Sequence, residues 1–177
     1  VNNTNTPARI YSQLRAWPEF RRLFGDHVQK HLFNGGALTA SNNIVRMQSR
    51  AARIDRAIVG ESARWGDARE FTIGQNPGHG QTFTRDEWWV TELHKLYTNF
   101  FPALNDLTLS RLRAANLYPN LGPPRFSQFG GAVSNGFGLV LTQTNTFGAI
   151  FFTLDGSDPR ESGTGAVSPT AQAYESA

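Results

Sequence analysis

The feature that most constrains the fold is a change in apolar spacing near Pro119. Before this residue, apolar side chains recur every three or four positions, which is typical of helices packed on one face. After Gly122-Pro123-Pro124 the period falls to two, and glycine-rich turns separate short apolar runs, as in strands. The sequence therefore predicts an α+β chain, with an all-α helical subdomain over residues 1–118 and a small β-sandwich over residues 119–177.

Five helical segments are expected in the first part. Their predicted ranges are 7–17, 19–33, 41–64, 84–101 and 107–117. Caps and stops set these bounds: Thr6-Pro7, Ser41 and the capping box Thr84-Arg85-Asp86-Glu87 as starts, Gly35-Gly36 and Pro102 as stops. The longest helix should bury a stripe of Ile44, Met47, Ala51, Ile54 and Ile58. On its other face, Arg53 and Arg56 bracket Asp55 and predict a solvated ion-pair surface.

Two runs in the second part are typical of strands, Leu139–Thr142 and Ala149–Leu154. The sequence Asp155-Gly156-Ser157-Asp158-Pro159 predicts a turn between strands, because Asp-Gly permits positive φ and a residue before proline is extended. Two clear runs are too few to close a sandwich. The β part is therefore expected to be truncated and to leave unpaired strand edges.

Composition limits the class of protein. With 177 residues, 39% of them hydrophobic and 18% charged, the chain suits a folded protein of one or two small domains. It has no cysteine, which excludes disulfides, thiol catalysis and cysteine-based zinc sites. No apolar run reaches the roughly 18 residues of a membrane span. The chain starts at Val1 and lacks a signal peptide, so we expect a mature or excised piece whose start lies upstream.

The charge pattern argues against a nucleic-acid partner. The formal net charge is +3 and the sequence pI is about 9.7. Nucleic-acid interfaces gather lysine and arginine on one face with aromatic residues between them. Here the cationic residues are almost all arginines, and they are scattered along the helices, several of them one turn from an acid.

The first candidate site lies at the end of the longest predicted helix, where Glu61, Arg64, Trp65 and Asp67 fall close together. These side chains could form a binding or catalytic cluster. Glu61 and Asp67 are six positions apart, however, which places them on different sides of an ideal helix. We favour a structural role in which an acid holds Arg64, joining the helix end to the next segment, and Trp65 anchors the packing.

Two further patterns have the spacing of known ligand sites. His27 and His31 are four apart on a predicted helix, as metal ligands often are, but no third ligand stands at a matching distance. Gly74, Gly78 and Gly80 could cradle a phosphate. No strand precedes them and no Lys-Ser/Thr follows, so a surface loop is the better interpretation.

Aromatic and acidic groups complete the candidates. A sugar-binding platform could be formed by Trp88, Trp89, Tyr97, Phe100 and Phe101. Their helical spacing favours a role in packing instead. Asp155 and Asp158 could bind calcium, but no EF-hand pattern surrounds them and the predicted turn already explains both.

Two sets of motifs resemble known families. The first resembles the C-terminal part of spore-coat-protein-H-like (CotH kinase family) bacterial proteins over roughly residues 7–119. It consists of Pro18–Arg21, Lys30–Thr39, Ala57-Ile58 with Glu61–Asp67, Thr84–Trp88, Leu112–Ala114 and Leu117–Pro119. The second, Phe151–Arg160, looks like the signature of the chitobiase/β-hexosaminidase C-terminal domain, a small immunoglobulin-like sandwich.

The first resemblance implies the helical C-terminal side of an atypical protein-kinase-like fold whose parent uses ATP and magnesium. The family's nucleotide and metal residues belong to segments before the matched part. No residue of this sequence therefore receives a catalytic, cofactor-binding or metal-binding role. The expected function is a structural segment that supports a kinase core.

The order of the two modules is familiar from large secreted bacterial proteins, so the resemblance implies an extracellular or cell-surface location. Its implied partners are the upstream part of the same protein or neighbouring chains, with no nucleic acid and no membrane span. An alternative is a non-catalytic assembly or adhesion component of a bacterial surface structure, with glycan as a candidate ligand.

Overall fold

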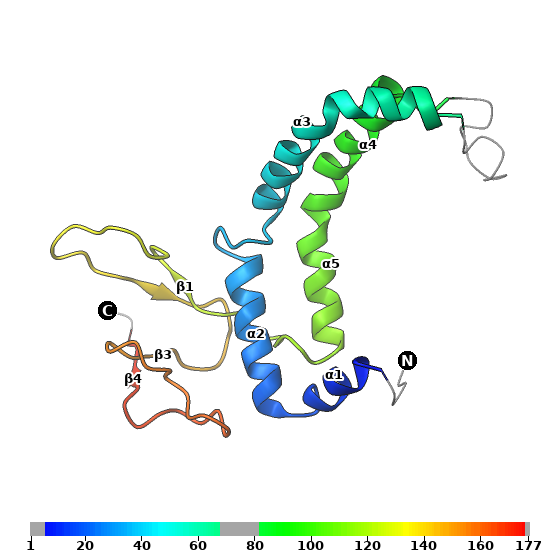
Figure 1. Cartoon of the computed structure of the whole chain (residues 1–177). Helices are drawn as coiled ribbons and strands as arrows, with labels where there is room; N and C mark the ends of the chain where they lie inside the picture. Colours follow the sequence, from blue (N-terminus) through cyan, green and yellow to red (C-terminus); the bar gives the residue numbers. More distant parts are fainter. Residues whose placement is uncertain (1–5, 68–81, 176–177) are drawn as a thin grey trace. The chain divides into compact units, whose positions relative to one another are not determined.

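The computed structural model describes residues 6–67 and 82–175. Its helical part begins with α1 (Ala8–Leu14), α2 (Pro18–Leu32) and α3 (Ala40–Trp65) (Figure 1). From Arg85 onward, four helical elements follow one another directly. These are the π-helical turn η1 (Arg85–Trp89), α4 (Val90–Lys95), a second π-helical turn η2 (Leu96–Phe100) and α5 (Phe101–Ala114). The all-helical character predicted up to residue 118 is confirmed for the described residues.

The chain divides into two compact units. One consists of Val1–Lys30 with Leu109–Ala177, and the other of His31–Thr108. The first unit thus contains the start of α2, the end of α5 and all the strands. The predicted boundary between residues 118 and 119 stays a prediction.

Helix α2 carries the start and stop signals expected of it. Pro18 occupies the first position and Glu19 the first turn, where proline and an acid are favoured. Val28 and Leu32 are buried on its inner face. The helix ends at Leu32, and the following residues Asn34 and Gly35 have φ values of 52° and 77°. The left-handed stop predicted at Gly35-Gly36 is therefore confirmed at Gly35, and Asn34 before it is left-handed as well.

The N-cap of helix α3 lies two residues before the predicted cap, Ser41. Thr39, with an extended backbone, occupies the N-cap position, and Ser41 is already inside the helix. The hydroxyl of Thr39 donates to the carbonyl of Gly36 at 2.9 Å and so stabilises the preceding turn. The predicted stripe is confirmed in part: Ala51 is buried, whereas Ile54 is 44% exposed.

The helices after residue 84 are more continuous than predicted. Thr84 caps η1 as expected, because its Oγ1 accepts a hydrogen bond from the Glu87 amide at 3.2 Å. The predicted break at Pro102 is wrong, since α5 begins at Phe101 and runs through it. Pro102 lies in the first turn of α5, directly after η2. A widened turn there accommodates the proline ring and its missing N–H. The last helix also ends earlier than predicted, and Asn116 has a φ of 56°.

The strands are short. β1 (Arg125–Phe126) pairs antiparallel with β2 (Leu141–Thr142), and β3 (Phe151–Phe152) pairs antiparallel with β4 (Gln172–Ala173). Each pair is a separate two-stranded sheet. The two predicted runs contain β2 and β3 but are longer than the observed ladders. No closed sandwich forms among the residues that the structure describes.

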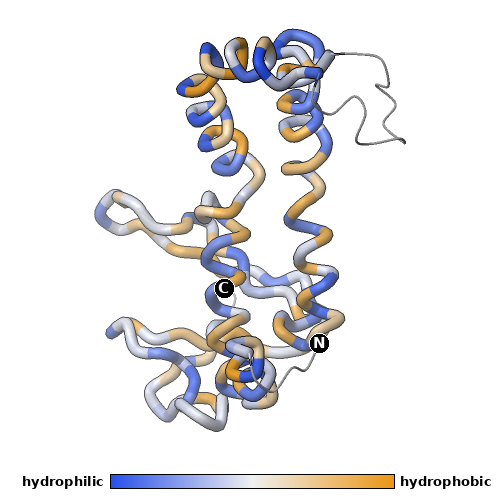
Figure 2. The backbone as a smooth tube through the Cα atoms, turned by 45° about the vertical axis from the view of Figure 1, so that its right-hand side comes forward, coloured by the Kyte–Doolittle hydropathy of each residue, from blue (hydrophilic) through white to orange (hydrophobic). Residues whose placement is uncertain are grey.

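Burial is sparse, and apolar and polar stretches alternate along the helices (Figure 2). The buried apolar residues are Val28, Leu32, Ala51, Leu109, Leu117, Tyr118, Leu141 and Ile150. Among the described helices, none combines the length and the apolar character that a membrane crossing requires.

Candidate functional site

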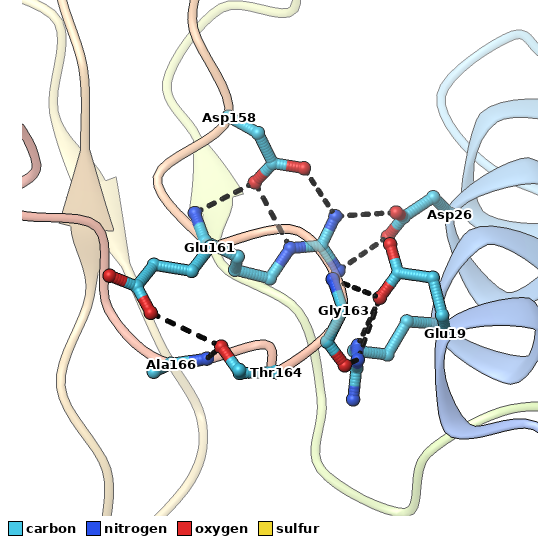
Figure 3. A network of polar contacts seen from close by, with 9 residues as sticks. Glu19, Asp26, Asp158, Glu161, Gly163, Thr164 and Ala166 are labelled. Carbon is cyan, nitrogen blue, oxygen red and sulfur yellow. Dashed lines mark hydrogen bonds and ion pairs between the residues drawn. The ribbon is translucent and has the colours of Figure 1, made fainter.

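A cluster of charged side chains joins α2 to the segment 158–163 within the first unit (Figure 3). We call it the clamp. It consists of Glu19, Arg22 and Asp26 on α2 and of Asp158, Arg160 and Gly163 on the later segment. The three helical residues are spaced by three and four positions, so they share one face of α2.

Arg160 is the centre of the clamp. Its Nη2 donates to Asp26 Oδ2 at 2.6 Å and its Nη1 to Asp26 Oδ1 at 3.3 Å. The same guanidinium donates through Nε and Nη2 to both oxygens of Asp158, at 3.1 and 3.0 Å. A planar fork of N–H groups suits such paired carboxylates. Hydrogen bonding to Asp158 and Asp26 raises the pKa of Arg160, and the bond from Arg160 lowers the pKa of Asp158.

Glu19 provides the second connection between the helix and the segment. Its Oε2 accepts from Arg22 Nη2 at 2.6 Å and from the Gly163 amide at 3.1 Å. Arg22 Nη2 in turn donates to the Gly163 carbonyl at 2.5 Å. The hydrogen bond from Arg22 lowers the pKa of Glu19, although partial burial opposes the shift. Gly163 is therefore held through both its amide and its carbonyl.

The turn before the clamp is built as the sequence predicts. Asp155 Oδ1 accepts from the Ser157 amide at 3.0 Å and from the Ser157 hydroxyl at 2.6 Å. These bonds lower the pKa of Asp155. Gly156 has a φ of 80°, and Asp158 Oδ1 accepts from the Arg160 amide at 2.9 Å. The turn-forming role of both aspartates is confirmed.

The loop that follows lies so close to Arg22 that it requires a glycine. Gly165 has a φ of 71°, and a Cβ added there would lie 2.8 Å from Arg22 Nε and 2.9 Å from Arg22 Cζ. Any larger residue would displace the Arg22 side chain from its position beside Glu19. The close approach of the loop to α2 therefore depends on this glycine.

Beside the clamp lies a groove of about 670 Å³ between α2 and residues 116–124. Tyr118 lines it and is only 5% exposed. Its hydroxyl donates to Gln29 Oε1 at 2.6 Å, and burial raises the pKa of Tyr118. The Arg113 guanidinium lies over the Tyr118 ring, 5.4 Å from its centre, and partly offsets this rise.

The second unit has its own charged connection. Arg85 donates to both carboxylate oxygens of Asp55, at 3.0 and 2.8 Å, and thereby joins η1 to α3. These bonds raise the pKa of Arg85. The predicted pairing of Asp55 with its neighbours Arg53 and Arg56 is wrong. On a helix, positions one or two apart do not face each other, so the carboxylate bonds to a residue from another element.

The predicted cluster at the end of α3 does not assemble. Glu61, Arg64 and Asp67 are exposed, and no ion pair within residues 6–67 and 82–175 joins Arg64 to either acid. Arg64 instead lies 4.9 Å from the centre of the Trp65 ring. That ring is 53% exposed and so does not anchor the packing as predicted. A backbone bond makes the expected connection instead, from the Phe83 amide to the Gly66 carbonyl at 2.9 Å.

The histidine pair is the predicted ligand pattern that lies within the described residues. His27 is exposed and His31 half-buried on α2. No group of three histidine, aspartate or glutamate side chains that could hold a metal ion occurs among the described residues. Gly74, Gly78 and Gly80 lie outside the described residues.

The predicted aromatic platform consists mostly of packed rings. Trp88 contacts the Phe83 ring at a centroid distance of 4.7 Å, and the indole Nε1 of Trp89 is buried. Trp88, Trp89, Tyr97 and Phe101 are half-buried, as expected of packing residues. Phe100 is the exception, with 50% of its surface exposed.

Sequence reasoning missed the clamp. Glu19, Arg22 and Asp26 have the spacing of one helical face, and Asp158 stands two residues before Arg160. These local signals exist, but they do not indicate that the two sets meet, since 134 positions separate Asp26 from Arg160.

In comparisons with protein-family models, curated proteins and solved structures, nothing matches this chain. Its function is therefore argued from the contacts above and from the sequence motifs.

Proposed function

We propose that this chain is a non-catalytic structural segment from the C-terminal side of a secreted protein similar to the CotH kinase family. Its role is to hold a β-rich segment against a helix that supports the kinase core. The observation that carries this proposal is the pairing of Arg160 with Asp26. Arg160 ends the chitobiase-like motif, and Asp26 lies on the helix that the kinase-like motif Pro18–Arg21 opens.

The protonation of the clamp supports a structural role. A general acid or base works best when its pKa lies near the operating pH. Hydrogen bonds from Arg22 and Arg160 instead lower the pKa values of Glu19 and Asp158. Both carboxylates therefore stay ionised near neutral pH and remain engaged with their partners, which stabilises a connection rather than a reaction.

Exposed apolar side chains support further packing against protein. Ile10 and Trp17 are 64% and 65% exposed, and Val45 and Val59 on α3 are also exposed to solvent. We assign these side chains to contacts with other protein. In this proposal their partner is the upstream part of the same protein or a neighbouring chain at the bacterial surface.

ATP and magnesium enter this proposal only through the parent protein. Magnesium in kinases is held by one or two carboxylate or amide side chains together with the ATP phosphates. The resemblance assigns this role to no residue of this chain. We derive no phosphoryl-transfer step from this chain.

The test measures binding and transfer by the chain alone. Isothermal titration calorimetry with ATP and magnesium should show no binding, and radiolabelled ATP should leave no phosphate on the chain or on a generic protein substrate. Tight binding together with transfer would overturn the proposal.

A second candidate function follows from the strand edges. Within residues 6–67 and 82–175, each strand of the two sheets pairs on one side only. An edge of this kind can accept a strand from another chain, as in assembly by β-strand addition. In this reading the chain is a non-catalytic assembly or adhesion component of a bacterial surface structure, with glycan as a ligand.

Two measurements separate this second function from the first. Sedimentation should show association that rises with protein concentration, and a monomer at every concentration counts against assembly. Glycan binding through the aromatic residues should disappear in the Trp88→Ala and Trp89→Ala variants. Binding that survives both substitutions excludes these rings as the platform.

A further inference from the structure

The groove beside Tyr118 has the size and walls of a binding site. Its volume of about 670 Å³ lies within the range of roughly 300–1,000 Å³ that is usual for ligand sites. Pro119, Leu121, Pro123 and Pro124 contribute apolar surface to its lining. The bond between Tyr118 and Gln29, which also line the groove, joins residue 118 to α2.

The charges that line the groove do not balance. Four arginines line it, whereas Asp26 is the single carboxylate among the described lining residues. Arg22 and Arg160 are engaged in the clamp with Glu19, Asp26 and Asp158. The surplus positive charge therefore comes from Arg21 and Arg113.

These two arginines present donors from different helices. Arg21, on α2, donates to the Arg15 carbonyl over a long 3.3 Å. Arg113, on α5, donates through Nε to the Pro119 carbonyl, also at 3.3 Å. Neither has a carboxylate partner within the part of the chain that the structure describes. A guanidinium in this state is suited to pair with a carboxylate of a ligand.

We propose that this groove binds an extended peptide segment that carries carboxylate side chains. Arg21 and Arg113 pair with the carboxylates, and the prolines with Leu121 contact the apolar side chains of the peptide. A nucleic-acid strand fits less well, because bases stack on exposed aromatic faces and the Tyr118 ring is buried. This inference does not depend on the proposed structural role.

The first experiment compares two peptides by isothermal titration calorimetry on the full chain. One contains glutamate, leucine and proline, and the other replaces each glutamate by glutamine. The glutamate peptide should bind at least about tenfold more tightly, and added salt should weaken it because the paired groups are accessible. Equal affinity for the two peptides overturns the proposal. Inorganic phosphate that binds as tightly as the glutamate peptide also overturns it.

The second experiment uses arginine variants. Arg21→Gln and Arg113→Gln should each weaken the glutamate peptide by about tenfold, because each removes a charge-assisted hydrogen bond. Arg111→Gln is the matched control, since Arg111 lies on α5 but not among the residues that line the groove. Its affinity should stay that of the wild type.

Arg113 also contacts Tyr118, so its variant needs a folding check by circular dichroism. Arg21 has no such ring contact among the described residues. The affinity of the Arg21→Gln variant for the glutamate peptide therefore decides the test. Unchanged binding by folded Arg21→Gln overturns the proposal.

Discussion

Arg160 Nη2 lies 2.6 Å from Asp26 Oδ2, although 134 positions separate the two residues. The same guanidinium pairs with Asp158, two positions before it. Because the guanidinium is planar, the two carboxylates are fixed on either side of one rigid group. One side chain thus connects the β-rich segment to α2.

Replacing Arg160 by glutamine should loosen this connection. The pairs are partly exposed, so we expect a loss of about 1 kcal/mol or less in unfolding free energy. A larger effect is expected on local order: the amide of Gly163, which bonds to Glu19, should exchange its hydrogen faster. Urea unfolding and amide NMR measure the two effects. Arg125→Gln is the control, and a Gly163 amide that is equally protected in both variants contradicts the account.

The clamp and the turn before it also predict a pH dependence. The pKa values of Glu19, Asp155 and Asp158 lie below their ordinary values of 4.5, 3.8 and 3.8. Between the lowered and ordinary values the unfolded chain binds more protons, so stability rises with pH there. The stabilisation is complete above the ordinary values and is lost as the pH falls through the lowered ones.

Melting temperatures measured from neutral to acidic pH should therefore fall below a pH of about 4.5. The double variant Glu19→Gln, Asp158→Asn should show a flatter profile, and Glu61→Gln, which removes an exposed carboxylate outside the clamp, should follow the wild type. A double variant that keeps the full acid sensitivity would place its origin elsewhere.

Tyr118→Phe tests a residue that lines the groove. The substitution removes the donor to Gln29 Oε1 and should cost about 1 kcal/mol, because a partly buried acceptor loses its bond. Tyr11→Phe is the matched control, since the Tyr11 ring is 42% exposed and contacts Phe20 by its edge. Denaturant unfolding measures both. Equal stability of the two variants argues against the bond.

Two glycine substitutions should change stability in opposite directions. Gly156 has a φ of 80°, and Gly156→Ala should destabilise the chain by about 1 kcal/mol, because left-handed backbone is unfavourable with a Cβ. Gly60 lies inside α3 with no atom within 4 Å of an added Cβ, so Gly60→Ala should stabilise by about 1 kcal/mol. Thermal unfolding measures both, and a shared sign contradicts the assigned conformations.

The helices could be predicted because their signals are local. The cap at Thr84 and the left-handed stop at Gly35 each involve residues within one turn. Pro102 misled the prediction because the π-helical turn η2 directly before α5 accommodates the proline ring and its missing N–H, so the helical run continues through it. The observed start at Phe101 follows η2, and a π-helical turn has no simple sequence signal.

The strands and the clamp could be predicted only in part. The turn at Asp155–Pro159 is local and was found. The length of a ladder depends on its partner strand. Phe126 pairs with Leu141, 15 positions away, and Phe152 pairs with Gln172, 20 positions away. An apolar period within one run does not indicate a partner at such a distance.

The long separation between Asp26 and Arg160 has a consequence for biosynthesis. During translation, α2 leaves the ribosome well before the residues that complete its charged contacts have been made. Contacts between distant positions also form slowly, since a long loop must close first. During this interval the nascent helix exposes Glu19 and Asp26 without their partner Arg160. Chaperones that recognise incompletely docked helices can bind it at this stage.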